Sequence, residues 1–265
     1  MNILKKIPLI LFILVLTNFV FAANRGGARL LAISQGTSLP TTYSLLNFSG
    51  GWSFVNPAGV VNYNNPALSL QYDQNGNSGI GLEIGVGGSW WGVAGGYSTR
   101  NCTGCNGTAR VALGFGFSSV DIGFRFENEL SGVGLLFNPQ GTHRWGLTAQ
   151  LNDPAGSNNN ISTLGFGYGY VAGSWEFALD ASKRIYEDQA TTENRLYVSP
   201  GVLFYISSVS LSLNYETLLN DTANQNTSTE NGSFWFGFNI DKNSWNLSVY
   251  IDYQNEIALD FTTLF

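Results

Sequence analysis

Apolar and polar residues alternate with a period of two along most of the chain after about residue 66. The segment 120–126 is the clearest example, with apolar residues at the even positions and small or charged residues at the odd ones. Successive side chains of a β-strand point to opposite faces, so this alternation predicts strands that separate two different environments. No stretch of this region has the period of an amphipathic helix.

The alternating segments number about fourteen, with twelve as the alternative count, and each is about 8 to 12 residues long. They start near residues 66, 78, 89, 107, 119, 131, 142, 162, 174, 194, 208, 230, 244 and 256. A tilted strand of about 9 to 11 residues crosses a bilayer. A soluble β-sandwich is the alternative, but its strands are shorter on average. The pattern therefore predicts an all-β fold, a transmembrane antiparallel up-and-down β-barrel.

The connections between these segments alternate in length, as in outer-membrane barrels with short periplasmic turns and longer outside loops. Short turns are predicted near Gly87, Ser118, Pro139–Gly141, Gly173, Ser207 and Asp241–Asn243. Long polar loops are predicted at Ser98–Gly107, Asn152–Asn160, Ile185–Glu193 and Leu218–Glu230. Three other outside loops, near Gly76, Asn128 and Asn255, are short. An even number of strands returns both ends of the barrel to the periplasm.

The first residues have the pattern of a secretory signal peptide. Lys5 and Lys6 precede an apolar run, Ile7–Phe21, and the small residues Ala22 and Ala23 follow it. A membrane anchor is the alternative, but the run is short and no second long apolar stretch follows. We therefore expect export with cleavage near Ala22, and we divide the chain into a signal peptide (1–22), an N-terminal segment (23–65) and a barrel (66–265).

The last predicted strand places apolar residues at alternate positions and ends on Phe265, with Phe261 four residues before it. This resembles the C-terminal signal by which the barrel-assembly machinery recognises outer-membrane proteins, although Thr263 departs from it. Trp and Tyr at strand ends are expected to form girdles at the two membrane interfaces. They are Trp90, Trp91, Tyr97, Trp145, Trp175, Tyr186 and Trp245. We expect a bacterial outer-membrane location, with membrane lipid and the assembly machinery as partners.

The composition agrees with a barrel that encloses a partly filled space. The chain has 32 glycines, 14% aromatic and 11% charged residues, and its net charge of -6 argues against a nucleic-acid partner. Fourteen strands lie between the eight that side chains fill and the sixteen or more that leave an aqueous channel. The charged residues predicted to face the lumen are Glu83, Asp121, Arg125, Arg144, Glu176, Asp180, Glu216, Asp252 and Asp260. These charges either pair in a solvated interior or line a mildly acidic path.

The segment 23–65 fits no alternating strand and ends in two turn motifs, Asn56-Pro57-Ala58-Gly59 and Asn64-Asn65-Pro66. Proline fixes its own φ and disfavours helix in the residue before it, so both motifs predict turns. The segment is interpreted as a plug-like element or as an ordinary connecting loop.

With its Asn56-Pro57-Ala58-Gly59 motif before about fourteen strands, the chain resembles a short member of the FadL-like outer-membrane transporters of long-chain fatty acids and aromatic hydrocarbons. The resemblance implies an N-terminal hatch that plugs the barrel, and hydrophobic small molecules as substrates with lateral release into the membrane. Gly95 and Gly96 on the third strand then mark a candidate kink.

The remaining candidates for chemistry are few. Cys102 and Cys105 could form a small disulfide across a loop, but a metal site is not expected because two further ligands are missing. His143 is the single histidine, at a predicted turn without an evident serine partner. Asp121 and Glu127 could do acid/base work only if they faced each other. We therefore expect no enzyme activity and no cofactor.

Two functional hypotheses remain open. In the first, the barrel passively transports small or hydrophobic solutes and the N-terminal segment is its plug. In the second, it is a structural or surface-interaction barrel with a closed lumen. The barrel itself is tested by Phe124→Arg, expected to cost about 2 to 4 kcal/mol if Phe124 faces the bilayer midplane, whereas Gly123→Ser on the inner face is expected to be much milder.

Overall fold

The computed structural model describes most of the predicted barrel and a short piece of the segment before it. The described residues are 56–62, 66–73, 79–100, 107–127, 130–139, 141–152, 160–187, 192–221, 233–242, 245–252 and 257–264. The predicted signal peptide (1–22) and most of the N-terminal segment lie outside them.

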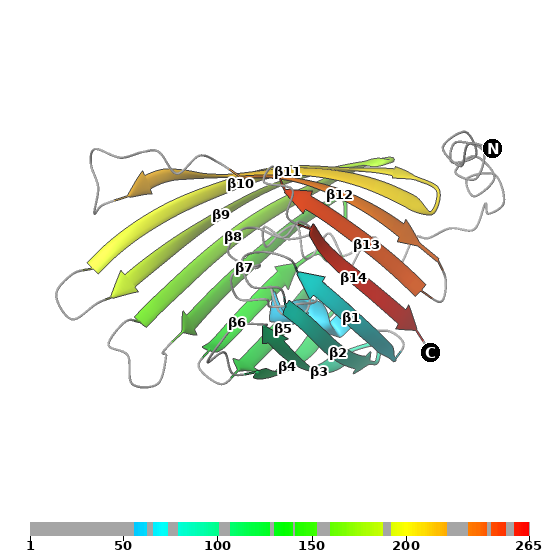
Figure 1. The fold of residues 1–265 in the computed structure, drawn as a ribbon, viewed down its shortest axis with the longest axis horizontal. Helices are drawn as coiled ribbons and strands as arrows, with labels where there is room; N and C mark the ends of the chain where they lie inside the picture. Colours follow the sequence, from blue (N-terminus) through cyan, green and yellow to red (C-terminus); the bar gives the residue numbers. More distant parts are fainter. Residues whose placement is uncertain are drawn as a thin grey trace.

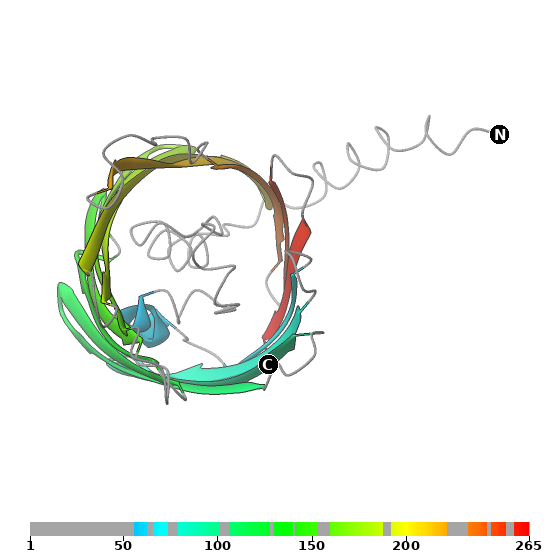
Figure 2. The ribbon, with the colours of Figure 1, turned by 60° about the vertical axis from the view of Figure 1, so that its left-hand side comes forward.

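Fourteen antiparallel β-strands form a closed up-and-down barrel (Figures 1 and 2). Each strand pairs with its neighbours in the chain, and β14 closes the barrel on β1 with Ala67 opposite Leu264. The strands are β1 (Ala67–Asp73), β2 (Gly79–Gly87), β3 (Trp91–Arg100), β4 (Thr108–Phe117), β5 (Val120–Glu127), β6 (Leu130–Phe137), β7 (His143–Asn152), β8 (Asn160–Ala172), β9 (Trp175–Glu187), β10 (Thr192–Ile206), β11 (Val209–Asp221), β12 (Ser233–Asp241), β13 (Trp245–Asp252) and β14 (Ile257–Leu264). The predicted fold class is confirmed, and each strand starts within three residues of its predicted start.

Tight turns join the strands at one end of the barrel, which we call the short-turn end. The connections β4–β5, β8–β9 and β10–β11 leave only two residues outside the strands, and the first of each has a positive φ: 46° at Ser118, 63° at Gly173 and 57° at Ser207. A positive φ at this position matches the turn to the right-handed twist of the flanking strands. Trp245 at the start of β13 pairs with Thr263, so the chain's last strand also ends at the short-turn end.

The two faces of the barrel wall differ in polarity. On β4, Val111, Leu113 and Phe115 are each at least 40% exposed, whereas the alternate residues Ala112 and Gly114 are buried. The inner face is the one that carries Gly114, because this glycine contacts the short helix inside the barrel. An apolar outer face on a closed barrel, which has no unpaired strand edge, is the arrangement that a lipid environment requires.

Aromatic side chains gather on the outer face at the short-turn end. The ring pairs there include Trp90–Phe115 (6.5 Å between centroids), Trp145–Tyr168 (4.4 Å), Trp175–Phe204 (4.3 Å) and Trp245–Phe261 (6.3 Å). Amphipathic rings of this kind favour the boundary between lipid and water. The four tryptophans belong to the set from which the interfacial girdles are predicted.

A six-residue 3-10 helix, η3 (Pro57–Asn62), lies inside the ring of strands against the wall formed by β2 to β6 (Figure 2). It is the only helix among the residues that the structure describes. In that same part of the chain, no helix has the length and apolar character needed to cross a membrane. The helix brings the end of the N-terminal segment into the barrel.

Candidate functional site

The Asn56-Pro57-Ala58-Gly59 motif forms the turn that starts η3. The side-chain Oδ1 of Asn56 accepts a hydrogen bond from the Ala58 amide (3.1 Å), and its carbonyl oxygen accepts one from the Gly59 amide (2.9 Å). Asparagine is a favoured residue before the first turn of a helix because its side chain satisfies a free amide, and proline is favoured directly after it. The motif is therefore a helix start as well as the predicted turn.

Asn56 also connects η3 to the barrel wall. Its side-chain Nδ2 donates a hydrogen bond of 3.2 Å to the carbonyl oxygen of Leu135 on β6, and only 1% of the residue is exposed. A buried amide that loses its partners costs about 1 to 3 kcal/mol, so both ends of this side chain hold η3 in place.

A row of glycines forms the surface on which η3 lies. Gly92, Gly114, Gly123 and Gly134 stand opposite one another on the adjacent strands β3, β4, β5 and β6. A Cβ atom would lie 2.0 Å from the Val60 oxygen at Gly92, 2.6 Å from Val60 Cγ1 at Gly114, 2.1 Å from the Ala58 nitrogen at Gly123 and 1.9 Å from Asn56 Oδ1 at Gly134. Only glycine allows this close approach of η3 to the wall. We call these four residues the glycine row.

The contacts of Gly123 overturn one expectation from the sequence. Gly123→Ser was expected to be mild because the residue faces the lumen, but a side chain at this position would collide with the backbone of Pro57 and Ala58. Gly169, on the inner face of β8, has room instead, since a Cβ atom there meets nothing closer than 3.9 Å. Gly169 is therefore the proper control for substitutions on the inner face.

Charged residues lie on the inner wall of β4 and β5 toward the end of the barrel opposite the short turns, which we call the long-loop end. Arg125 is 2% exposed and forms an ion pair with Glu127, to which its Nε donates a hydrogen bond of 3.0 Å. Arg110, also 2% exposed, stands directly opposite Glu127 on β4. Asp121 is buried at the other end of β5, beside Gly116. Asp121 and Glu127 thus lie at opposite ends of one strand and do not face each other.

A second group of inner charges lies on β7 and β9. Glu176 is 4% exposed and accepts a hydrogen bond of 3.0 Å from the Tyr205 hydroxyl. Buried Arg144 interacts electrostatically with Glu176, and its Nε donates to the Gly141 carbonyl oxygen at 2.8 Å. Asp180 is buried further along β9. The buried polar residues also include five serines and threonines: Thr148, Thr163, Ser199, Ser210 and Ser212.

The other residues singled out from the sequence have no described side-chain environment or lie elsewhere. Glu83, Glu216, Asp252 and Asp260 belong to strands, but their side chains are outside the described part of the structure, as are Cys102, Cys105 and Phe265 altogether. Phe261 is 41% exposed and lies on the outer face, next to Trp245. Its role as an insertion signal stays a prediction.

His143 lies on the outer face at the short-turn end, within the aromatic cluster. It shares a hydrogen bond of 2.7 Å with the Tyr168 hydroxyl, and its ring centroid lies 5.0 Å from that of Tyr170. Among the described residues, no three His, Cys, Asp or Glu side chains are grouped so that they could hold a metal ion.

Sequence reasoning missed two features of the inner wall. Arg110 was not singled out, although it occupies an even position in 108–117, on the same face as Ala112 and Gly114. The glycine row was missed because its members lie far apart in the chain and meet only through the strand register. A search for glycines at inward positions near short turns could have found it.

No protein-family model and no curated protein matches the chain. Solved structures do share its architecture. The TodX monoaromatic hydrocarbon channel, as a deltaS2 mutant, superposes with a TM-score of 0.55 at 9% identity, covering 82% of this chain and 94% of that one. A bacterial polysaccharide outer membrane secretin gives a TM-score of 0.51 at 8% identity, covering 77% and 99%. The chain has the fold of an outer-membrane β-barrel.

Proposed function

We propose that the barrel is a passive transport channel of the bacterial outer membrane and that residues 23–65 are its plug. One observation carries this proposal: η3, the described end of that segment, lies inside the barrel on the glycine row. A chain end that passes through the lumen can block the passage of solutes, and moving it can open one. Four adjacent glycines at the contact support a dedicated seat for η3 rather than an incidental contact.

The proposed orientation places the short-turn end in the periplasm. Short turns on that side and longer loops outside are the rule for outer-membrane barrels, and the aromatic cluster at this end fits the inner interface. η3 is then attached near the periplasmic mouth, because Gly92 is the second residue of β3 and Gly123 the fourth of β5, both just after short turns. The barrel-assembly machinery and membrane lipid are the partners that this location implies.

The described inner wall supports a hydrated passage. Arg125 is paired with Glu127. Glu176 interacts electrostatically with Arg144 and accepts a hydrogen bond from Tyr205, so these charges are compensated in place. This arrangement favours the interpretation of paired charges over that of an acidic path for the part of the lumen that the structure describes. A polar wall of this kind is compatible with the passage of small solutes in water.

We also propose that the transported solutes are hydrophobic and that the protein is a member of the FadL-like transporters. The support for this proposal is the resemblance in the Asn56–Gly59 motif, the fourteen strands and the fold shared with TodX, itself a monoaromatic hydrocarbon channel. Uptake of a monoaromatic hydrocarbon by cells with and without the protein tests this part separately from conductance.

Planar-bilayer conductance of the refolded mature protein, compared with a variant lacking residues 24–55, tests the plug. We expect low conductance from the mature protein and a steady channel from the variant, because the deletion keeps η3 in its seat and removes the chain before it. Silence from both proteins, with folding verified by heat-dependent gel mobility, would favour the second candidate, a structural or surface-interaction barrel. The buried, hydrogen-bonded anchor of Asn56 is the observation that favours a permanently closed lumen.

A further inference from the structure

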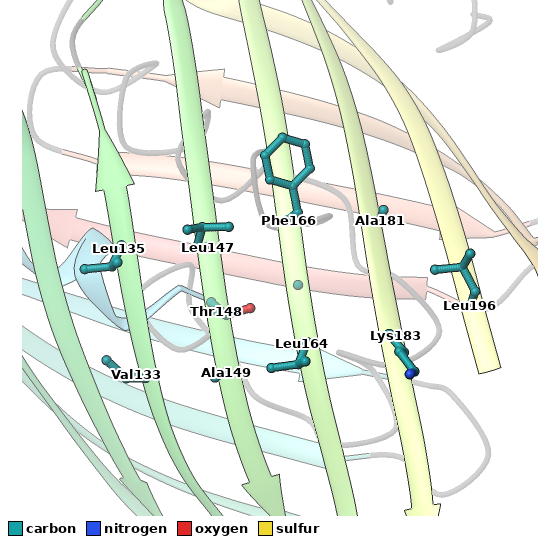
Figure 3. Close-up of a pocket in the computed structure, with 11 residues that line it drawn as sticks. Val133, Leu135, Leu147, Thr148, Ala149, Leu164, Phe166, Ala181, Lys183 and Leu196 are labelled. Atoms are coloured by element: carbon teal, nitrogen blue, oxygen red, sulfur yellow. The ribbon is translucent and has the colours of Figure 1, made fainter. Parts of the chain in front are cut away.

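The outer wall formed by β6 to β10 is not smooth but contains a hollow, whose lining residues are drawn in Figure 3. Its volume is about 520 Å³, within the range of small-molecule sites in proteins. It arises because two small outward residues, Ala149 on β7 and Ala181 on β9, lie among larger apolar side chains such as Leu147, Leu164 and Phe166. We call this hollow the outer groove.

One charged residue, Lys183, borders this mostly apolar groove. It stands between Leu164 on β8 and Leu196 on β10, directly opposite both, and its side chain is exposed on the outer face. Within the part of the chain that the structure describes, Lys183 has neither a hydrogen-bond nor an ion-pair partner. A lysine on the lipid face costs about 2 to 4 kcal/mol at the bilayer midplane but only about 0 to 1 kcal/mol near an interface.

The depth of Lys183 can be gauged from the aromatic cluster at the short-turn end. Trp175 belongs to that cluster, and Lys183 follows it by eight positions (175 to 183) on the same strand. At about 3.4 Å per residue and a tilt of about 40°, the separation along the barrel axis is about 20 Å. The apolar band of such barrels is about 25 Å tall, so Lys183 lies near its opposite edge, on the long-loop side.

We propose that the outer groove binds an acidic lipid of the surrounding leaflet, with an acyl chain in the groove and a phosphate of the headgroup on the Lys183 ammonium. The chemistry is complementary at both ends. Apolar walls around Ala149 and Ala181 receive a hydrocarbon chain, and the lysine meets the lipid at the depth where phosphate groups lie. The inference rests on the proposed membrane location and is independent of whether the lumen conducts.

The test is native mass spectrometry of the refolded mature protein released from detergent, titrated with phosphatidylglycerol and separately with phosphatidylcholine. We expect one phosphatidylglycerol to be retained in preference to phosphatidylcholine. Lys183→Gln should weaken that binding about fivefold, the equivalent of the roughly 1 kcal/mol that a basic residue contributes near an anionic surface. Filling the groove with Ala149→Leu and Ala181→Leu together should abolish it.

Matched controls separate these effects from general ones. Lys242→Gln removes the same charge at the short-turn end, and Ala109→Leu adds the same bulk on the outer face of β4, away from the groove. Both should bind like the unaltered protein.

The proposal is overturned if Lys183→Gln leaves the preference for phosphatidylglycerol intact, or if the filled groove still retains the lipid. Sedimentation gives a further test. If the unaltered protein is a dimer and only the variant with the filled groove is a monomer, a second copy of the chain occupies the groove and the proposal is overturned. Conductance measured on the same samples tells a failed channel from a failed lipid site.

Discussion

Asn56 makes three hydrogen bonds to described residues, at the point where η3 begins. Its side chain accepts from Ala58 and donates to Leu135, and its carbonyl oxygen accepts from Gly59. The first and third bonds shape the start of η3, and the second binds η3 to the wall. The bonds that shape the start of η3 are therefore different from the bond that docks η3 on the wall, and substitutions of Asn56 can separate the two roles.

Asn56→Ala should lower the free energy that holds η3 in place. The lost helix cap costs about 1 kcal/mol. The lost hydrogen bond to Leu135 adds to this cost. Hydrogen exchange at the amides of Ala58 and Gly59 measures this. Asn56→Ser is the matched variant, because serine is also a good cap but is too short to keep the bond to Leu135. We expect Asn56→Ser to retain more protection at Ala58 than Asn56→Ala does. Equal exchange in both variants would show that the cap contributes nothing.

Phe124→Arg places a charge on the outer face, in the middle of β5, where Phe124 is 39% exposed. An arginine at the bilayer midplane costs about 2 to 4 kcal/mol, so unfolding by urea in lipid vesicles should show a loss of that size. Gly169→Ser, on the roomy part of the inner face, is the control and should cost much less. Equal tolerance of the two changes would refute the assignment of the outer face to lipid.

Strands and turns could be predicted because their signals are local. The alternation in 120–126 lies within one strand, and the turns at Ser118, Gly173 and Ser207 lie where it breaks off. The seat of η3 could not be predicted in this way. It depends on which residue of β3 stands opposite which residue of β4, β5 and β6. That register follows from the lengths of the turns between the strands, which alternation within one strand does not give. The contact between Glu176 on β9 and Tyr205 on β10 depends on register in the same way, whereas Arg125 and Glu127 pair within one strand, β5.

The long-loop ends of β4 and β5 provide a prediction at the scale of elements. Glu127→Ala should cost about 1.5 to 3 kcal/mol, because it removes a charged hydrogen-bond and ion-pair partner from buried Arg125. Unfolding in vesicles measures the loss. The double variant Arg125→Met with Glu127→Leu should recover most of it, since an apolar pair of similar volume replaces a buried ion pair at little cost. A single-variant loss below about 1 kcal/mol would mean that water already reaches the pair.

The whole molecule combines a rigid wall with an internal attachment point. Pairing of β14 with β1 closes the sheet, so no strand edge is left unpaired and the wall holds without help from the lumen. The lumen is thereby free for function, and the N-terminal segment reaches it through η3. In this account, opening of the channel depends on the contact between η3 and the glycine row, whereas the stability of the barrel does not.

Single-channel conductance of Gly134→Val, compared with Gly169→Ala and the unaltered protein, tests the central claim most directly. Valine at position 134 would occupy the place of the Asn56 side chain and push η3 off its seat, whereas alanine at position 169 meets only ordinary contacts. We expect openings that are much more frequent in Gly134→Val, with Gly169→Ala and the unaltered protein alike and all three equally folded. Identical conductance in all three would contradict the account, because the plug would then not depend on the seat of η3.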